Sequence, residues 1–165
     1  MFSTLFEKQS QLLKALAHPS RLEILQLLQD QELPVTDIQF MLDLPQANIS
    51  QHLMILREAG VVTPRRDGKQ MYYKVADHKL TSINLLSRQC VLEKTDADQE
   101  ASSEERAVAR DFLSLLPLTH DPVCGMQLSP KTASYFYDHK GRRHYFCASG
   151  CLKVFTKDPQ AYARD

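Results

Sequence analysis

The chain has 165 residues, a hydrophobic fraction of 43% and equal numbers of basic and acidic residues, so its formal net charge is zero. This length suits one domain or two small ones, and the composition is that of a globular protein. No apolar run is long enough to span a membrane, and the first residues lack the basic start and apolar stretch of a signal peptide. We therefore expect a cytoplasmic protein without a membrane partner, whose four cysteines serve metal or redox chemistry rather than a disulfide framework.

The charges are distributed unevenly along the chain. Residues 93–118 are acidic, and they separate two mildly basic ends. A protein with no net charge that binds nucleic acid must gather its basic residues locally. We expect a first domain at 1–92, an acidic linker at 93–118 with a helix over 103–116, and a second domain at 119–165.

The first domain begins with helical spacing of its apolar residues and then changes period. Pro19 suits the first turn of a helix, Gly60 suits a position just past a helix end, and Asp67-Gly68 is a strong hairpin signal. The expected elements, in chain order, are helices over 3–16, from Pro19 onward, over 35–41 and over 46–59, strands over 61–63 and 71–75 joined by a turn at 65–69, and a helix over 77–92.

This order of elements is that of a winged helix-turn-helix, in which one helix enters the major groove and a hairpin projects basic residues toward the DNA backbone. Helical phase turns Ile49, Leu53 and Leu56 inward and leaves a polar face outward. His52 lies near the inner edge, where it either contacts DNA or packs within the domain. The residues that we expect at double-stranded operator DNA are Gln46, Asn48, Ser50, Gln51, His52, Arg65, Arg66 and Lys69.

Three stretches of this domain resemble the ArsR/SmtB family of metalloregulatory repressors. They are the opening ALAHPSRLEIL at 15–25, the helix NISQHL at 48–53 with LREAGVV at 56–62, and the wing RRDGK at 65–69 with Tyr72-Tyr73. The resemblance implies a homodimer joined through the first and fifth helices, on a two-fold symmetric operator. An apolar stripe on the fifth helix suits either that seam or packing within one protomer: Leu80, Ile83, Leu86 and Cys90.

The sequence departs from this family at its sensing sites. Many members bind metal through paired cysteines early in the third helix, where this chain has Pro34-Val35-Thr36. A second family site uses Asp and His residues across the fifth helices, and here only Asp77 and His78 are present. Two ligands do not complete a tetrahedral site. Sensing, where it is retained, must therefore have moved to another part of the chain.

The second domain carries three cysteines: Cys124, Cys147 and Cys151. Strands at 135–137 and 144–146 and a helix over 149–156 would bring them together, since Cys147 and Cys151 are one helical turn apart. Three converging thiols suit a soft or borderline transition metal ion, with Cu(I) or Zn(II) favoured. The candidate fourth ligands are His120, Met126, His139 and His144.

Residues 119–162 resemble a YHS domain, and the cysteine spacing also resembles the related TRASH module. The resemblance rests on DPVCGM at 121–126, YFY at 135–137, YFC at 145–147 and Cys151, and it implies heavy-metal binding.

For the whole chain we expect a mainly α fold with small β elements, a winged helix-turn-helix domain followed by a small α+β three-cysteine module. It would act as a metal-responsive repressor and not as an enzyme, since no catalytic pattern is present.

Two other interpretations stay open. One is a thiol-redox or persulfide-responsive repressor, for which Cys90 is the candidate. The other is a constitutive DNA-binding protein whose module holds a structural zinc ion or docks a partner protein, because a domain this small usually needs a metal or disulfides to fold.

Overall fold

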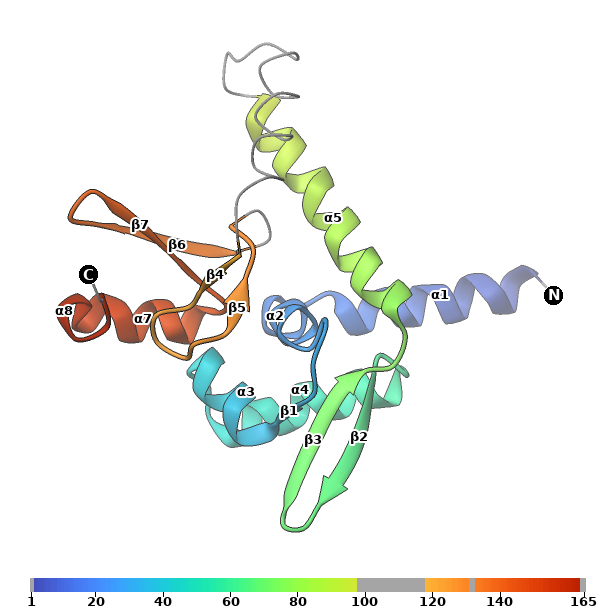
Figure 1. The fold of residues 1–165 in the computed structure, drawn as a ribbon. Helices are drawn as coiled ribbons and strands as arrows, with labels where there is room; N and C mark the ends of the chain where they lie inside the picture. Colours follow the sequence, from blue (N-terminus) through green and yellow to red (C-terminus); the bar gives the residue numbers. More distant parts are fainter. Residues whose placement is uncertain (1, 98–117, 131–132, 164–165) are drawn as a thin grey trace. The chain divides into compact units, whose positions relative to one another are not determined.

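The computed structural model of the chain describes residues 2–97, 118–130 and 133–163 (Figure 1). The chain divides into two compact units, Met1–Ser87 and Arg88–Asp165. The helix expected over 103–116 lies outside the described residues. Among those residues, no helix combines the length and apolar character needed to cross a bilayer.

The first unit consists of four helices and a three-stranded sheet, followed by the start of a fifth helix. The elements are α1 (Phe2–Leu16), α2 (Pro19–Leu27), β1 (Leu33–Pro34), α3 (Val35–Leu42), α4 (Gln46–Glu58), β2 (Val62–Asp67), β3 (Gln70–Val75) and α5 (His78–Ala97). The expected order of elements is therefore confirmed, with α5 running five residues into the stretch that we had expected to be linker. Figure 1 shows the hairpin of β2 and β3 projecting beyond α3 and α4.

Local chemistry explains where these helices begin and end. His18 caps α2, since its Nδ1 accepts a hydrogen bond from the backbone N–H of Ser20 at 3.1 Å, and Pro19 occupies the first turn, where its missing N–H costs nothing. After α4, Gly60 adopts φ +70°, a left-handed conformation that glycine takes without strain. The core of the unit is aliphatic, with Ile24, Leu25, Ile38, Ile49, Leu56 and Val61 all fully buried.

The wing differs from the expected hairpin in its extent. β2 continues through Arg65 and Arg66 to Asp67, so the connecting loop is only Gly68-Lys69 and not residues 65–69. The expected two arginines at the tip therefore lie on a strand, paired with Tyr72 and Met71 of β3. The sheet order is β1-β3-β2, and the two-residue β1 pairs Leu33 with Tyr73.

From residue 118 onward, the described residues of the second unit form two antiparallel pairs of short strands and two short helices. The elements are β4 (Thr119–His120), β5 (Gln127–Leu128), β6 (Tyr135–His139), β7 (Arg142–Phe146), α7 (Ser149–Lys157) and α8 (Pro159–Tyr162). The hairpin of β6 and β7 turns at Lys140 and Gly141, both at positive φ, as a tight two-residue turn requires. Phe146 and Phe155 are fully buried, and their ring centroids lie 5.0 Å apart, so they form the centre of the small core.

Candidate nucleic-acid interface and candidate metal centre

The helix α4 separates its buried and exposed residues as the sequence period predicts. Ile49, Leu53 and Leu56 are at most 1% exposed. The polar residues that we expect at DNA are all exposed: Gln46, Asn48, Ser50 and Gln51. The polar set is thus available for an outside partner, because none of these side chains is needed to fill the core.

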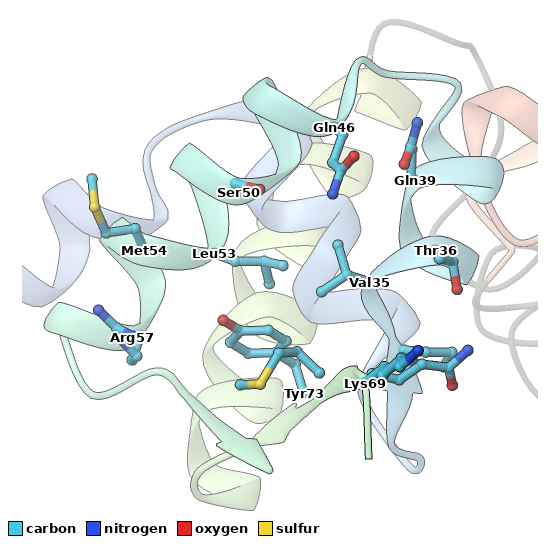
Figure 2. A pocket seen from close by; sticks show the side chains of 13 residues that line it. Val35, Thr36, Gln39, Gln46, Ser50, Leu53, Met54, Arg57, Lys69 and Tyr73 are labelled. Atoms are coloured by element: carbon cyan, nitrogen blue, oxygen red, sulfur yellow. The ribbon is translucent and has the colours of Figure 1, made fainter. Parts of the chain in front are cut away.

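A groove of about 450 Å³ lies between α3, α4 and the wing (Figure 2). Gln46 and Ser50 line it from α4 and Lys69 from the wing loop. Four polar residues that the sequence reasoning does not include also line it: Thr36, Gln39, Arg57 and Gln70. Arg57 was detectable, since it follows Ser50 by seven residues and so shares its helix face.

The two arginines of the wing have different surroundings. Arg65 donates hydrogen bonds to both carboxylate oxygens of Glu32 at 2.9 to 3.0 Å and to Asp67 at 3.2 Å. These bonds hold the pKa of the Glu32 carboxyl below its ordinary value. Arg66 is exposed, and its Nε donates to the carbonyl of Gly68 at 3.2 Å. Arg66 and Lys69, at and beside the tip of the wing, have no acidic side chain bonded to them in the described part of the chain.

His52 is partly buried on α4, and its ring lies 4.5 Å from that of His18. Its Nδ1 is buried and has no hydrogen-bond partner among the residues that the structure describes. Burial, followed by the nearby charges of His18 and Arg21, lowers the pKa of His52. These contacts give His52 a packing role between α2 and α4, which was one of the two roles that the sequence left open.

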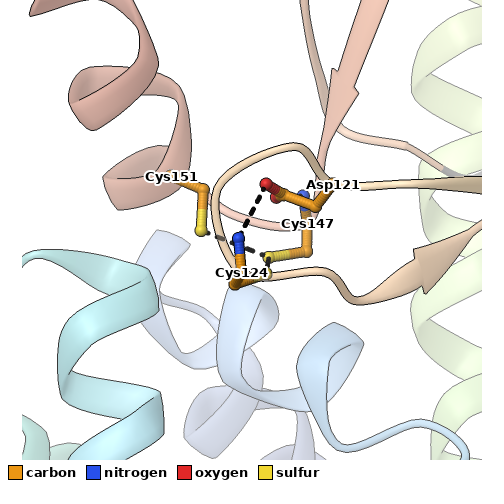
Figure 3. A group of neighbouring side chains, drawn as sticks. All are labelled: Asp121, Cys124, Cys147 and Cys151. Carbon is orange, nitrogen blue, oxygen red and sulfur yellow. Dashed lines mark hydrogen bonds between the residues drawn. The ribbon is translucent and has the colours of Figure 1, made fainter. Parts of the chain in front are cut away.

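The three cysteines of the second unit converge (Figure 3). The Sγ atoms of Cys124 and Cys147 are 3.5 Å apart, and those of Cys147 and Cys151 are 3.6 Å apart. Cys124 comes from the loop between β4 and β5, Cys147 follows β7 directly, and Cys151 lies in the first turns of α7. Four thiolates around a tetrahedral zinc ion with Zn–S bonds near 2.3 Å stand about 3.8 Å apart, so these separations fit a thiolate site.

The buried carboxylate of Asp121 completes this cluster. Its ligand oxygen and the three sulfur atoms all lie within 4.8 Å of one another, and Asp121 is only 1% exposed. One of its oxygens accepts the backbone N–H of Val123 at 2.8 Å, and the other accepts that of Cys147 at 2.8 Å. Asp121 therefore ties together two cysteine-bearing segments that are far apart in sequence.

The histidines considered as fourth ligands from the sequence do not join this group. Among the described residues, the group within 4.8 Å contains no histidine. His139 and His144 instead pack against Phe155, with ring centroids 6.2 and 5.0 Å away. Asp121 was missed because it was counted as part of the loop motif and not as a donor.

Electrostatics within the cluster favours one thiolate. Hydrogen bonds from Cys147 and Cys151 lower the pKa of Cys124 to about 3, while the same contacts raise the pKa of Cys147. Burial raises the pKa of Asp121, which its backbone donors partly oppose. A soft cation would compensate for the negative charge that Asp121 and further thiolates bring to this buried place, because a thiol must lose its proton to become a ligand.

Two family models match the chain. Residues 18–63 match bacterial regulatory proteins of the arsR family, and residues 119–165 match the YHS domain. The biofilm growth-associated repressor of Agrobacterium fabrum is 46% identical over 72 residues, which are 44% of this chain and 62% of that protein. The chain thus covers less than two thirds of this relative. The transcriptional activator HlyU of Vibrio cholerae is 40% identical over 78 residues, 47% of this chain and 72% of that protein.

A solved structure extends this likeness to the fold. It is the solution structure of a homodimeric winged helix-turn-helix DNA-binding domain from Mycobacterium bovis, described as a possible ArsR-family transcriptional regulator. The two are 27% identical with a TM-score of 0.55, over 61% of this chain and 93% of that one. The chain therefore belongs to the arsR family of bacterial regulatory proteins and carries a YHS domain after its arsR-type part.

Proposed function

We propose that this protein is a homodimeric repressor that binds a two-fold symmetric operator and changes its affinity when the cysteine cluster takes up a soft or borderline transition metal ion. The observation that carries the metal part is the convergence of Cys124, Cys147 and Cys151 on the buried Asp121. The DNA part rests on α4, the groove beside it and the membership of the arsR family.

The DNA contacts divide by chemistry. Asn48 and Gln51 are exposed amides on α4, and amides pair with adenine in the major groove. Arg66 and Lys69 carry the charge of the wing, and such cations bind phosphates without reading sequence. Gln46, Ser50 and Arg57 line the groove between α4 and the wing, where the edge of a DNA backbone would lie.

The dimer is supported by apolar side chains that the described chain leaves uncovered. On α1, Leu5, Phe6 and Leu13 are 48 to 65% exposed, and on α5 Leu86 is 61% exposed. Large apolar residues gathered on two helices mark an interaction surface. The related Mycobacterium bovis domain is homodimeric by its description, so we assign these faces of α1 and α5 to a second copy of the chain.

The metal ion would bind through the three sulfur atoms, with Asp121 close enough to act as a fourth ligand or to orient the others. Thiolates select soft and borderline ions, so Cu(I) and Zn(II) are the favoured ions. The bound cation would supply positive charge that stabilises the thiolate forms. Since residues 98–118 connect α5 with β4 of the module, a change in the module can reach the dimer helices through the chain itself.

The test compares metal-free and metal-loaded full-length protein on a duplex selected from a random pool. We expect Zn(II) or Cu(I) to bind stoichiometrically and to change operator affinity by about 5- to 150-fold, the usual range of allosteric coupling. Cys147→Ser should abolish both effects and leave the affinity of the metal-free protein unchanged. Stoichiometric binding with no change in operator affinity would show that the ion is structural.

A matched variant separates metal sensing from thiol-redox sensing. Cys90 is exposed on α5 and lies outside the cluster. Cys90→Ser should therefore retain the full metal response. Loss of regulation in Cys90→Ser, with metal binding intact, would favour the redox mechanism instead.

A further inference from the structure

A cavity of about 600 Å³ opens beside the cysteine cluster. Cys124 lines this cavity together with the loop that carries it, whereas Cys147 and Cys151 do not line it. Cys151 is fully buried and Cys147 is 9% exposed. A ligand that arrives from this side therefore meets the sulfur of Cys124 first.

Four residues with basic side chains line this cavity: His120, Arg142, Arg143 and His144. The one carboxylate among the lining residues is that of Asp121, whose oxygens already accept backbone N–H groups. Arg143 is bonded to Asp138 at 2.8 and 3.0 Å. Arg142, by contrast, is exposed and makes no ion pair within the described residues.

Arg142 also borders a second cavity. This cavity, of about 530 Å³, shares Arg142 and His144 with the first and adds His139 and Lys140. The guanidinium of Arg142 thus stands where two basic depressions meet, on the approach to Cys124. A guanidinium in such a place is suited to bind a carboxylate with two parallel hydrogen bonds.

We infer that the cavity beside Cys124 binds an anionic complex of the metal with a carrier thiol that bears carboxylates. Arg142 holds a carboxylate of this carrier while the metal passes to the cluster. This inference rests on the proposed metal site. In a reducing compartment, soft ions are held by thiols and not as hydrated ions. At each exchange a bond from the metal to a cluster sulfur forms and a bond to the carrier sulfur breaks. Cys124 is already a thiolate, so the first exchange releases the carrier as its thiolate. At Cys147 and Cys151 the departing carrier thiolate takes the proton that the cluster thiol loses, so charge and atoms balance in every exchange.

The experiment measures the rate at which full-length, metal-free protein takes zinc from two carriers. One carrier is glutathione, whose zinc complex is anionic and bears carboxylates, and the other is 2-mercaptoethanol, which has no carboxylate. Transfer is stopped with excess chelator at set times, and the zinc retained by the desalted protein is measured. Arg142→Gln should slow transfer from the glutathione complex about tenfold, the lower end of electrostatic steering effects, and leave transfer from 2-mercaptoethanol unchanged.

Two further variants test whether position or charge alone matters. Arg142→Lys keeps the charge and should retain most of the rate. Lys157 lies at the end of α7 and lines neither cavity. Lys157→Gln removes a positive charge there and should leave the transfer rate unchanged. Equal slowing with both carriers in Arg142→Gln would overturn the inference but leave the metal site standing, since Arg142 would then only offset the charge of the cluster. Failure of the wild-type protein to take zinc from either carrier would overturn the metal site and the inference together.

Discussion

Replacing Asp121 by Asn should lower the free energy of unfolding of the YHS module more than an Asp-to-Asn substitution at any exposed position. The carboxylate is 1% exposed and presents one oxygen to the N–H of Val123 and the other to the N–H of Cys147, both at 2.8 Å. An amide has only one acceptor oxygen, so its NH₂ group must face one of these N–H donors. One charge-assisted hydrogen bond is lost, and one buried donor is left without a partner.

The magnitude follows from these two losses. A hydrogen bond to a charged group contributes about 1.5–3 kcal/mol, and an unsatisfied buried donor costs about 1–3 kcal/mol. Burial raises the pKa of Asp121, so removing the charge recovers part of this loss. We expect a net destabilisation of the metal-free module of about 2–4 kcal/mol. Because Asp121 also orients the cluster, metal affinity should fall by about 10- to 100-fold, as it does when partners of metal ligands are removed.

The assay is urea unfolding of the metal-free full-length chain, followed residue by residue through NMR signals of the module. Asp138→Asn is the matched control, because this carboxylate lies in the same module, is half exposed and forms an ion pair with Arg143. Its loss should cost far less than that of Asp121, because water and salt screen an exposed ion pair. If Asp121→Asn and Asp138→Asn unfold at the same urea concentration, Asp121 does not join the two segments, and the reasoning is wrong.

Three other predictions concern the arsR-type part. Gln51→Ala should reduce discrimination between bases by about 1–3 kcal/mol. Lys69→Ala should instead weaken binding to all duplexes and lower the salt dependence by about one counterion. If both variants change sequence preference equally in selection from a random pool, the assignment of Gln51 to bases and Lys69 to phosphates is wrong. Glu32→Gln should tighten DNA binding and steepen its salt dependence, because it removes the negative charge that Arg65 contacts at 2.9 to 3.0 Å, while the ion pair of Arg65 with Asp67 at 3.2 Å remains. Unchanged binding in a salt titration would mean that Arg65 does not reach the phosphates. Burial lowers the pKa of His52 below its ordinary value of 6.5. The neutral imidazole therefore contributes to the free energy of unfolding in full above pH 6.5, and this contribution is lost as the pH falls through the lowered pKa. His52→Gln should reduce the loss of stability at acid pH when the free energy of unfolding is measured against pH, and an identical loss in the variant would assign it to other groups.

The sequence predicted best what depends on local period. Ile49, Leu53 and Leu56 recur at helical spacing, and all three are buried as that spacing requires. The sequence also predicts that the three cysteines lie close together, because the hairpin brings Cys147 back toward Cys124 and the following helix places Cys151 one turn after Cys147. The end of α4 at Gly60 followed from the one residue that tolerates φ +70°.

The features that the sequence did not predict depend on distant partners. The strand β1 is two residues long and exists only through its pairing with Tyr72 and Tyr73, about forty residues later. The role of Asp121 depends on the N–H of Cys147, on the far side of the hairpin. The ion pair of Arg65 with Glu32 joins β2 to the loop before β1. No local pattern of residue types contains these contacts, since each is created by the fold.

The position of the paired cysteines of the family explains why sensing would need a separate module here. At that position Pro34, Val35 and Thr36 line the groove beside α4, so a metal bound there would act directly on the candidate DNA surface. With those residues in place, the cysteine cluster of the YHS module is the candidate metal site among the described residues. Metal then affects operator binding only if it binds the free and the DNA-bound dimer with different affinity, and by linkage the operator must change metal affinity by the same factor. Measuring both affinities on the same protein therefore closes a thermodynamic cycle, and a cycle in which operator DNA leaves metal affinity unchanged would exclude metal as the signal for this regulator.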